Sequence, residues 1–177
     1  LSRGANSLVE AGSLLQKNAL PPVLFVARNV LASWIVFAPL MAVLTLAYLP
    51  ISGLHFALLA VPLLLLLQGI LALVLAQVLA IMAAALRDTL QILGFALSMG
   101  IFLSPVLFPI GLFPPAWQWV LFANPMTPLV MGYQAVLLQG SWPSLNVWTT
   151  SMVWLLMLSL LLNGLLKRSR DELVDWL

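Results

Sequence analysis

The sequence predicts an all-α polytopic membrane protein, and three observations support this prediction. Of the 177 residues, 63% are hydrophobic and only 7% are charged, whereas soluble domains carry about 25% charged residues. Residues 29–86 and 89–166 contain no Asp, Glu, Lys or Arg, so each block has room for two crossings of roughly 20 residues. Apolar runs such as 61–67 do not alternate in polarity as membrane β-strands do, which favours helices.

Four spans are predicted in chain order, at about 24–49, 56–84, 89–108 and 147–166. Pro21 and Pro22 precede the first span, where proline suits the first helical turn, and Pro50 follows its end. The second span is long for one crossing, which predicts either a tilt or an extension beyond the membrane. Asp88 is predicted as the N-cap of the third span, with Gln91 in the capping-box position.

The region 105–146 is apolar but contains seven of the 12 prolines. A proline-broken backbone at membrane depth is tolerated only inside protein or beside a water-filled cavity. We therefore expect a re-entrant hairpin of short helices at about 110–140 on the outer side, called the outer hairpin below, which lines or closes a passage. The alternative is an apolar loop that lies flat on the outer surface.

Helix start and stop signals divide the outer hairpin. Pro115 is predicted to begin a short helix that ends near Asn124-Pro125. Thr127 is predicted to cap a second helix, with Pro128 at its first position and Gly140 after its end. This second helix would be about 18 Å long, which is too short to cross a membrane.

The basic residues predict the orientation, because lysine and arginine favour the cytoplasmic side. With four spans, all seven lie on one side, and the 50–55 loop and the 109–146 region on the other side have none. Both ends of this chain, including the tail 167–177, are therefore predicted to be cytoplasmic. The basic residues are Arg3, Lys17, Arg28, Arg87, Lys167, Arg168 and Arg170.

Residues able to perform catalysis or bind metal are scarce. His55 is the only histidine and there is no cysteine, so no metal-ligand spacing and no catalytic residue are predicted. We expect His55 to be a solvated loop residue. No charged residue falls at mid-membrane depth, where ion-coupled transporters carry such groups. If the chain transports actively, the energy must come from another subunit.

Four motifs follow one another in the order and spacing of a known family. They are Leu14-Leu15-Gln16-Lys17-Asn18-Ala19-Leu20-Pro21, Leu86-Arg87-Asp88-Thr89, Ser104-Pro105-Val106-Leu107-Phe108-Pro109 and Asn124-Pro125-Met126-Thr127-Pro128. They resemble elements of the ABC type-2 transporter permeases, in the branch of the polysaccharide, O-antigen and teichoic-acid exporters. The chain departs from the family pattern at Leu20, at Leu86 and at Gln134, where members often have Phe, Tyr and Arg respectively.

The resemblance implies six spans, of which this chain would hold the last four. Because the chain also begins with Leu1 rather than Met, we expect an N-terminally truncated fragment. Residues 1–21 would form a cytoplasmic segment that couples to a separate ATP-binding subunit, and 22–177 the transmembrane domain. The coupling residues would be Leu15, Lys17, Leu20 and Pro21.

The resemblance also implies roles for residues farther along the chain. Arg87 and Asp88 form the family motif at the cytoplasmic turn. The outer gate and conduit residues would be Ser104, Pro105, Pro109, Asn124, Pro125 and Tyr133. The expected partners are the ATP-binding subunit, a second permease copy in a homodimer, membrane lipids and a lipid-linked glycan, but no nucleic acid. ATP and Mg²⁺ would bind the partner subunit, and this chain would hold no cofactor.

The resemblance favours a permease subunit of an ATP-driven exporter of lipid-linked polysaccharide in a bacterial inner (plasma) membrane. The chain itself would not be an enzyme. Three other interpretations stay open. The chain could be a permease for drugs or small lipids, a non-catalytic membrane assembly subunit, or a membrane enzyme that acts on lipid-linked sugars.

Overall fold

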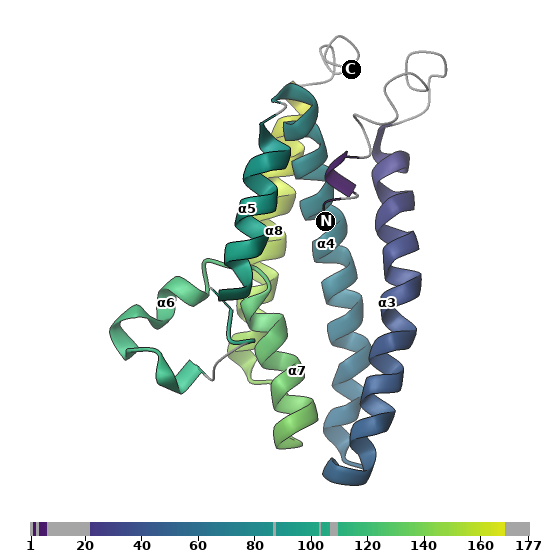
Figure 1. Ribbon diagram of the computed structural model, residues 1–177, viewed down its shortest axis with the longest axis vertical. Helices are drawn as coiled ribbons and strands as arrows, with labels where there is room; N and C mark the ends of the chain where they lie inside the picture. Colours follow the sequence, from purple (N-terminus) through teal and green to yellow (C-terminus); the bar gives the residue numbers. More distant parts are fainter. Residues whose placement is uncertain are drawn as a thin grey trace. The chain divides into compact units, whose positions relative to one another are not determined.

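The computed structural model describes residues 2, 4–6, 22–86, 88–102, 104–106 and 110–168. Within these ranges every regular element is a helix, which confirms the predicted all-α class. Figure 1 shows the long helices and the short elements between them. They are α3 (Pro22–Ser52), η1 (Phe56–Leu59), α4 (Ala60–Ala85), α5 (Thr89–Phe102), η2 (Ile110–Leu112), η3 (Pro115–Trp117), α6 (Gln118–Leu121), α7 (Thr127–Gln139) and α8 (Leu145–Arg168).

Three helices in the described part of the chain are long and apolar enough to cross a membrane. They occupy the ranges predicted for the first, second and last spans. The chain is therefore a multi-pass membrane protein. The three segments are Val23–Pro50, Phe56–Ala85 and Leu145–Arg168.

The third predicted span, 89–108, is shorter than expected. Helix α5 has 14 residues, or about 21 Å at 1.5 Å per residue, and ends at Phe102. Residues 104–106 form a turn instead of a fourth helical crossing. The physical reason is Pro105, which disfavours helical geometry at the residue before it.

The outer hairpin contains one short turn of helix and one longer helix. The four residues of α6 follow the turn that begins at Pro115, and turns fill the chain between α6 and α7. Helix α7 has 13 residues, or about 20 Å, and Pro128 is its second residue, one position later than predicted. The predicted pair of short helices is therefore reduced to one substantial helix, α7.

The structure divides into two compact units, and the boundaries fall within α3, α4, α5 and α8. The first unit consists of Leu1–Val36, Gly69–Phe95 and Leu155–Leu177. Its hydrophobic core joins Val26 of α3 to several α4 residues and to Leu162 of α8.

The second unit consists of Phe37–Gln68 and Ala96–Trp154, and it contains the outer hairpin. Its core includes Leu64 of α4 and Leu129 of α7, both almost fully buried. Gly132 lets α7 approach closely here, because a Cβ at this position would lie 2.9 Å from Leu64 Cδ2 and 3.2 Å from Val147 Cγ1. Helix α7 is thus packed against both α4 and α8.

Candidate functional site

Asn124 connects the outer hairpin to the end of α5. Its Nδ2 donates a hydrogen bond to the carbonyl oxygen of Gly100 at 3.0 Å. Its Oδ1 accepts one from the backbone N–H of Met126 at 3.0 Å. Gly100 lies in the last turn of α5, where carbonyl oxygens lack a partner within the helix. One side chain thus satisfies an orphan carbonyl and closes the turn before α7.

Thr127 connects the start of α7 to the end of α6. It is fully buried, and its Oγ1 donates to the carbonyl oxygen of Leu121 at 2.6 Å. The prediction that Thr127 caps α7 is wrong, since the N-cap position is Met126, without a side-chain cap. The threonine is the first helical residue, and its hydroxyl group satisfies a carbonyl oxygen of the preceding helix.

Gln134 connects α7 to the turn that follows α5. Its Nε2 donates to the carbonyl oxygen of Pro105 at 2.6 Å. The adjacent Ser104 is buried, and its Oγ donates to the carbonyl oxygen of Ile101 at 3.2 Å. The Ser104-Pro105 turn is therefore fixed both to α5 and to α7.

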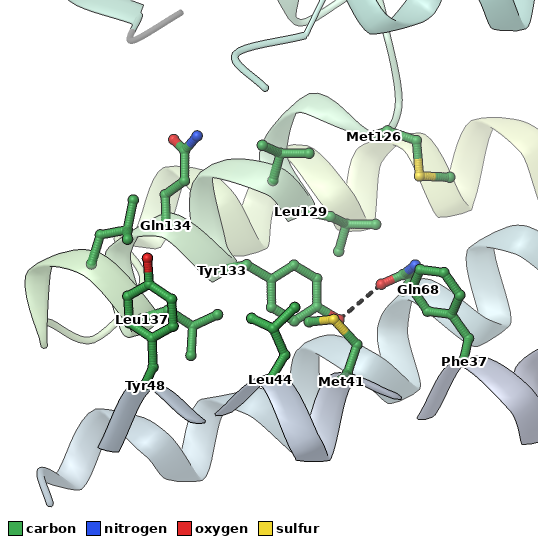
Figure 2. Close-up of a pocket in the computed structure, with 12 residues that line it drawn as sticks. Phe37, Met41, Leu44, Tyr48, Gln68, Met126, Leu129, Tyr133, Gln134 and Leu137 are labelled. Atoms are coloured by element: carbon green, nitrogen blue, oxygen red, sulfur yellow. Dashed lines mark hydrogen bonds between the residues drawn. The ribbon is translucent and has the colours of Figure 1, made fainter. Parts of the chain in front are cut away.

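Tyr133 connects α7 to α4. Its phenol group donates to Oε1 of Gln68 at 2.8 Å, as Figure 2 shows. The bond pairs two polar side chains that project into largely apolar surroundings. It matters for stability because a buried polar group without a partner costs about 1–3 kcal/mol.

Two further contacts reach the outer hairpin from other elements. His55 Nε2 lies 3.0 Å from the carbonyl oxygen of Val136, and its Nδ1 lies 2.9 Å from that of Gly53. His55 therefore contacts the last turn of α7, and the expectation of a merely solvated residue is wrong. In addition, Trp154 Nε1 of α8 donates to the carbonyl oxygen of Phe122 at 3.0 Å.

Helix α7 ends at Gln139 and is followed by Gly140, as the sequence predicted. Gly140 has a φ of 61° in the left-handed region, which residues with a Cβ rarely adopt. The backbone N–H of Ser141 then donates to the carbonyl oxygen of Ala135 at 3.0 Å. This glycine-terminated end fixes the length of α7.

A cavity of about 370 Å³ lies beside Tyr133. Figure 2 shows residues of α3 on one side and residues of α7 on the other, with Gln68 of α4 between them. All the lining residues belong to the second unit. Their side chains are mostly aliphatic or aromatic, and none is charged.

The structure describes some of the predicted site residues and not others. Ser104, Pro105, Asn124, Pro125 and Tyr133 all lie in the second unit, and hydrogen bonds link four of them to neighbouring elements. Asp88 lies in the first unit, is exposed, and accepts backbone hydrogen bonds through its carbonyl oxygen. Leu15, Lys17, Leu20, Pro21, Arg87 and Pro109 lie outside the described residues.

The sequence-based site omitted several residues that the structure adds: Gln68, His55, Gln134 and Trp154. The two glutamines had a recognisable signal, because they are polar side chains within otherwise apolar stretches. The described residues contain no group of three His, Asp or Glu side chains that could hold a metal ion. The site therefore consists of hydrogen bonds between uncharged groups and of apolar packing.

Comparisons with known proteins give a consistent result. Residues 12–138, more than half of the chain, match the family described as ABC-2 type transporter. A relative from Myxococcus xanthus is the O-antigen export system permease protein RfbA. The two sequences are 31% identical over 146 residues, which is 79% of this chain and 55% of that protein. The chain thus spans little more than half the length of this relative.

Proposed function

The chain belongs to the ABC-2 type transporter family, and we propose that it is the membrane-spanning permease subunit of an ATP-driven exporter of lipid-linked polysaccharide. In this proposal a separate ABC subunit binds ATP and Mg²⁺, and a second copy of the permease completes the conduit. The similarity to an O-antigen export permease supports the choice of substrate class. The chain itself transports and performs no catalysis.

The proposed location is a bacterial inner membrane, with both ends of this chain in the cytoplasm. The charged residues that the structure describes are Arg28, Asp88, Lys167 and Arg168, all of the first unit. The second unit contains no charged residue in its sequence. Because lysine and arginine favour the cytoplasmic side, this distribution supports the proposed orientation.

The observation that carries the proposal is an uncharged hairpin fastened by separate hydrogen bonds. A lipid-linked glycan is a polar chain on an apolar anchor, so its conduit needs few charges. Interhelical hydrogen bonds in membranes contribute about 0.6–2 kcal/mol each. Bonds of this strength hold α7 in one position yet permit its displacement when the ATP-binding subunit moves. Helix α7 would then act as the outer gate of the conduit.

We expect Tyr133→Glu to abolish export while the permease still assembles with its ATP-binding subunit. A carboxylate in this part of the protein is costly, by about 2.5–3.5 kcal/mol for a central membrane position, and it removes the phenol that donates to Gln68. Tyr133→Phe is the matched control, because it keeps the ring and loses one hydrogen bond. Surface polysaccharide is measured by immunoblot in cells that lack the chromosomal permease. Wild-type export by Tyr133→Glu would contradict a gate at α7.

The proposed ATP-binding partner is tested by co-purification of the full-length permease with the ATPase encoded beside it. We expect a stable complex that is lost when Lys17 and Pro21 are both changed to alanine. These residues lie in the proposed coupling segment, outside the described part of the chain. A permease that never retains an ATPase would favour an assembly subunit. A complex that exports drugs or small lipids instead of glycan would overturn only the substrate class.

A further inference from the structure

Both ring nitrogens of His55 lie against backbone carbonyl oxygens. Nε2 lies 3.0 Å from the carbonyl oxygen of Val136, and Nδ1 lies 2.9 Å from that of Gly53. A neutral imidazole has one N–H donor and one acceptor nitrogen, whereas a protonated imidazole has two donors. A neutral ring therefore turns one lone pair toward a carbonyl oxygen, and only the protonated ring donates to both.

The two carbonyl oxygens lie at the C-terminal ends of two helices. Gly53 directly follows α3, and Val136 lies in the last turn of α7. The backbone N–H groups of Gly140 and Ser141 both donate to the carbonyl oxygen of Ala135. The carbonyl oxygen of Val136 therefore does not receive the bond from position 140 that would continue the helix. Because C-terminal helix ends carry partial negative charge, they favour a cation between them.

The local conformation of the chain brings the ring of His55 to the end of α7. His55 has an extended backbone, with φ −137° and ψ 154°, and begins η1 without capping it through its side chain. The ring lies against Gly140, where a Cβ would be 3.7 Å from both Cδ2 and Nε2. His55 is only half-buried, so protons can reach it from solvent.

The segments packed against His55 carry no charged residue in their sequence. They are the loop at 53–55, η1, the last turn of α7 and residues 140–144, and the rest of the second unit also lacks Asp, Glu, Lys and Arg. The other titratable side chains of this unit are the phenols of Tyr48 and Tyr133. Phenols stay uncharged between about pH 5 and about pH 8, whereas histidine side chains change charge in this range. A charge that changes with pH in this unit therefore belongs to His55.

We propose that His55 is a pH-dependent switch that positions the outer hairpin by linking the end of α7 to the end of α3. When protonated, His55 donates to Gly53 and Val136 together, and when neutral it keeps only one of these bonds. The last turn of α7 then opens more readily. The link itself does not depend on the exported substrate. If α7 is the outer gate, as the proposed function has it, acidification holds the gate in the position seen here.

The test is amide hydrogen exchange of the full-length permease in lipid nanodiscs at about pH 5 and at about pH 8. Mass spectrometry reads the exchange, and each rate is divided by the intrinsic rate at that pH. We expect residues 136–141 to open about tenfold less often at the acidic pH, which corresponds to about 1.4 kcal/mol. Residues 149–154 of α8 are the internal control, and their corrected exchange should not change.

Two variants provide the matched comparison. His55→Gln keeps a donor and an acceptor but takes up no proton in this pH range, so the exchange of residues 136–141 should lose its pH dependence. His55→Arg is charged at both pH values and offers several N–H donors, so we expect protection at both. If His55→Arg does not elute as a single folded species, His55→Lys supplies the permanent charge instead.

Three results would overturn the proposal, and none of them depends on transport. The first is corrected exchange of residues 136–141 that does not change with pH in the wild-type protein. The second is the same pH dependence in His55→Gln, which would assign it to another group. The third is an equal change in residues 149–154, which would indicate a general change in stability.

Export at different external pH values is measured separately, because it tests the gate and not the link. We expect wild-type export to slow at about pH 5 relative to His55→Gln. If the amide exchange behaves as expected but export does not slow, the switch at His55 stands and the role of α7 as the outer gate fails.

Discussion

Asn124→Asp is expected to abolish export, although it changes the side chain by a single group. The wild-type Nδ2 donates to the carbonyl oxygen of Gly100 at 3.0 Å. In the variant a carboxylate oxygen faces that carbonyl, so an attraction becomes a repulsion and a charge enters an uncharged part of the protein. Together these effects cost about 3 kcal/mol or more. The measurements are surface polysaccharide and thermal unfolding of the purified complex.

Two comparisons test whether the loss of the Nδ2 donor of Asn124 causes the defect. Asn124→Ala removes both hydrogen bonds but adds no charge, so we expect a smaller loss than in Asn124→Asp. A protonated carboxyl group can donate, so export or stability of Asn124→Asp should partly recover at acidic pH, while the alanine variant should not. If the aspartate variant exports like the wild type at neutral pH, Asn124 does not fasten the outer hairpin.

Gly132→Leu is expected to have a similarly large effect, because it separates α7 from α4 and α8. Even a Cβ alone at this position would lie 2.9 Å from Leu64 Cδ2 and 3.2 Å from Val147 Cγ1. Alanine requires only a small shift of flexible side-chain ends. Leucine adds three more carbon atoms to a packed contact, and such overpacking costs about 1–3 kcal/mol or more. Thermal unfolding and export should both fall, much more for leucine than for alanine.

A double variant distinguishes this contact from general misfolding. Leu64→Ala removes the nearest side chain and by itself should destabilise the fold, since Leu64 is fully buried. Combined with Gly132→Leu, it vacates the space that leucine needs. We expect the pair to be less destabilising than the sum of the single changes by at least about 1 kcal/mol. Strict additivity would show that Gly132 and Leu64 do not limit the position of α7.

The sequence predicted the parts of the fold that depend on local composition. The uncharged blocks identified the helices α3, α4 and α8, and Pro128 and Gly140 marked the two ends of α7. Each of these signals affects the backbone within a few residues of its own position, so a short stretch of sequence is enough to recognise it. The length of α5 was overestimated because the apolar run continues past Pro105, and hydropathy does not report that a proline stops a helix.

The candidate site was predicted only in part, for a different physical reason. Asn124 and Tyr133 were identified by motif, but their partners Gly100 and Gln68 lie 24 and 65 residues away. No local pattern specifies which distant carbonyl or amide group a side chain will meet. His55 was misjudged in the same way, since its contact with Val136 joins residues 81 positions apart.

Side-chain donors of the outer hairpin bond more often to backbone carbonyl oxygens than to other side chains. This difference has a consequence for how the protein can change through evolution. Several hydrogen bonds run from a side-chain donor to a backbone carbonyl oxygen, which every amino acid possesses. The residue that supplies the carbonyl oxygen can therefore be replaced by another that fits the packing, and the hydrogen bond is kept. Tyr133 and Gln68 form the exception, because each supplies its own side chain, and an inherited change at either calls for a compensating change at the other. Such donor–acceptor pairs include Asn124–Gly100, Gln134–Pro105, Thr127–Leu121 and Trp154–Phe122.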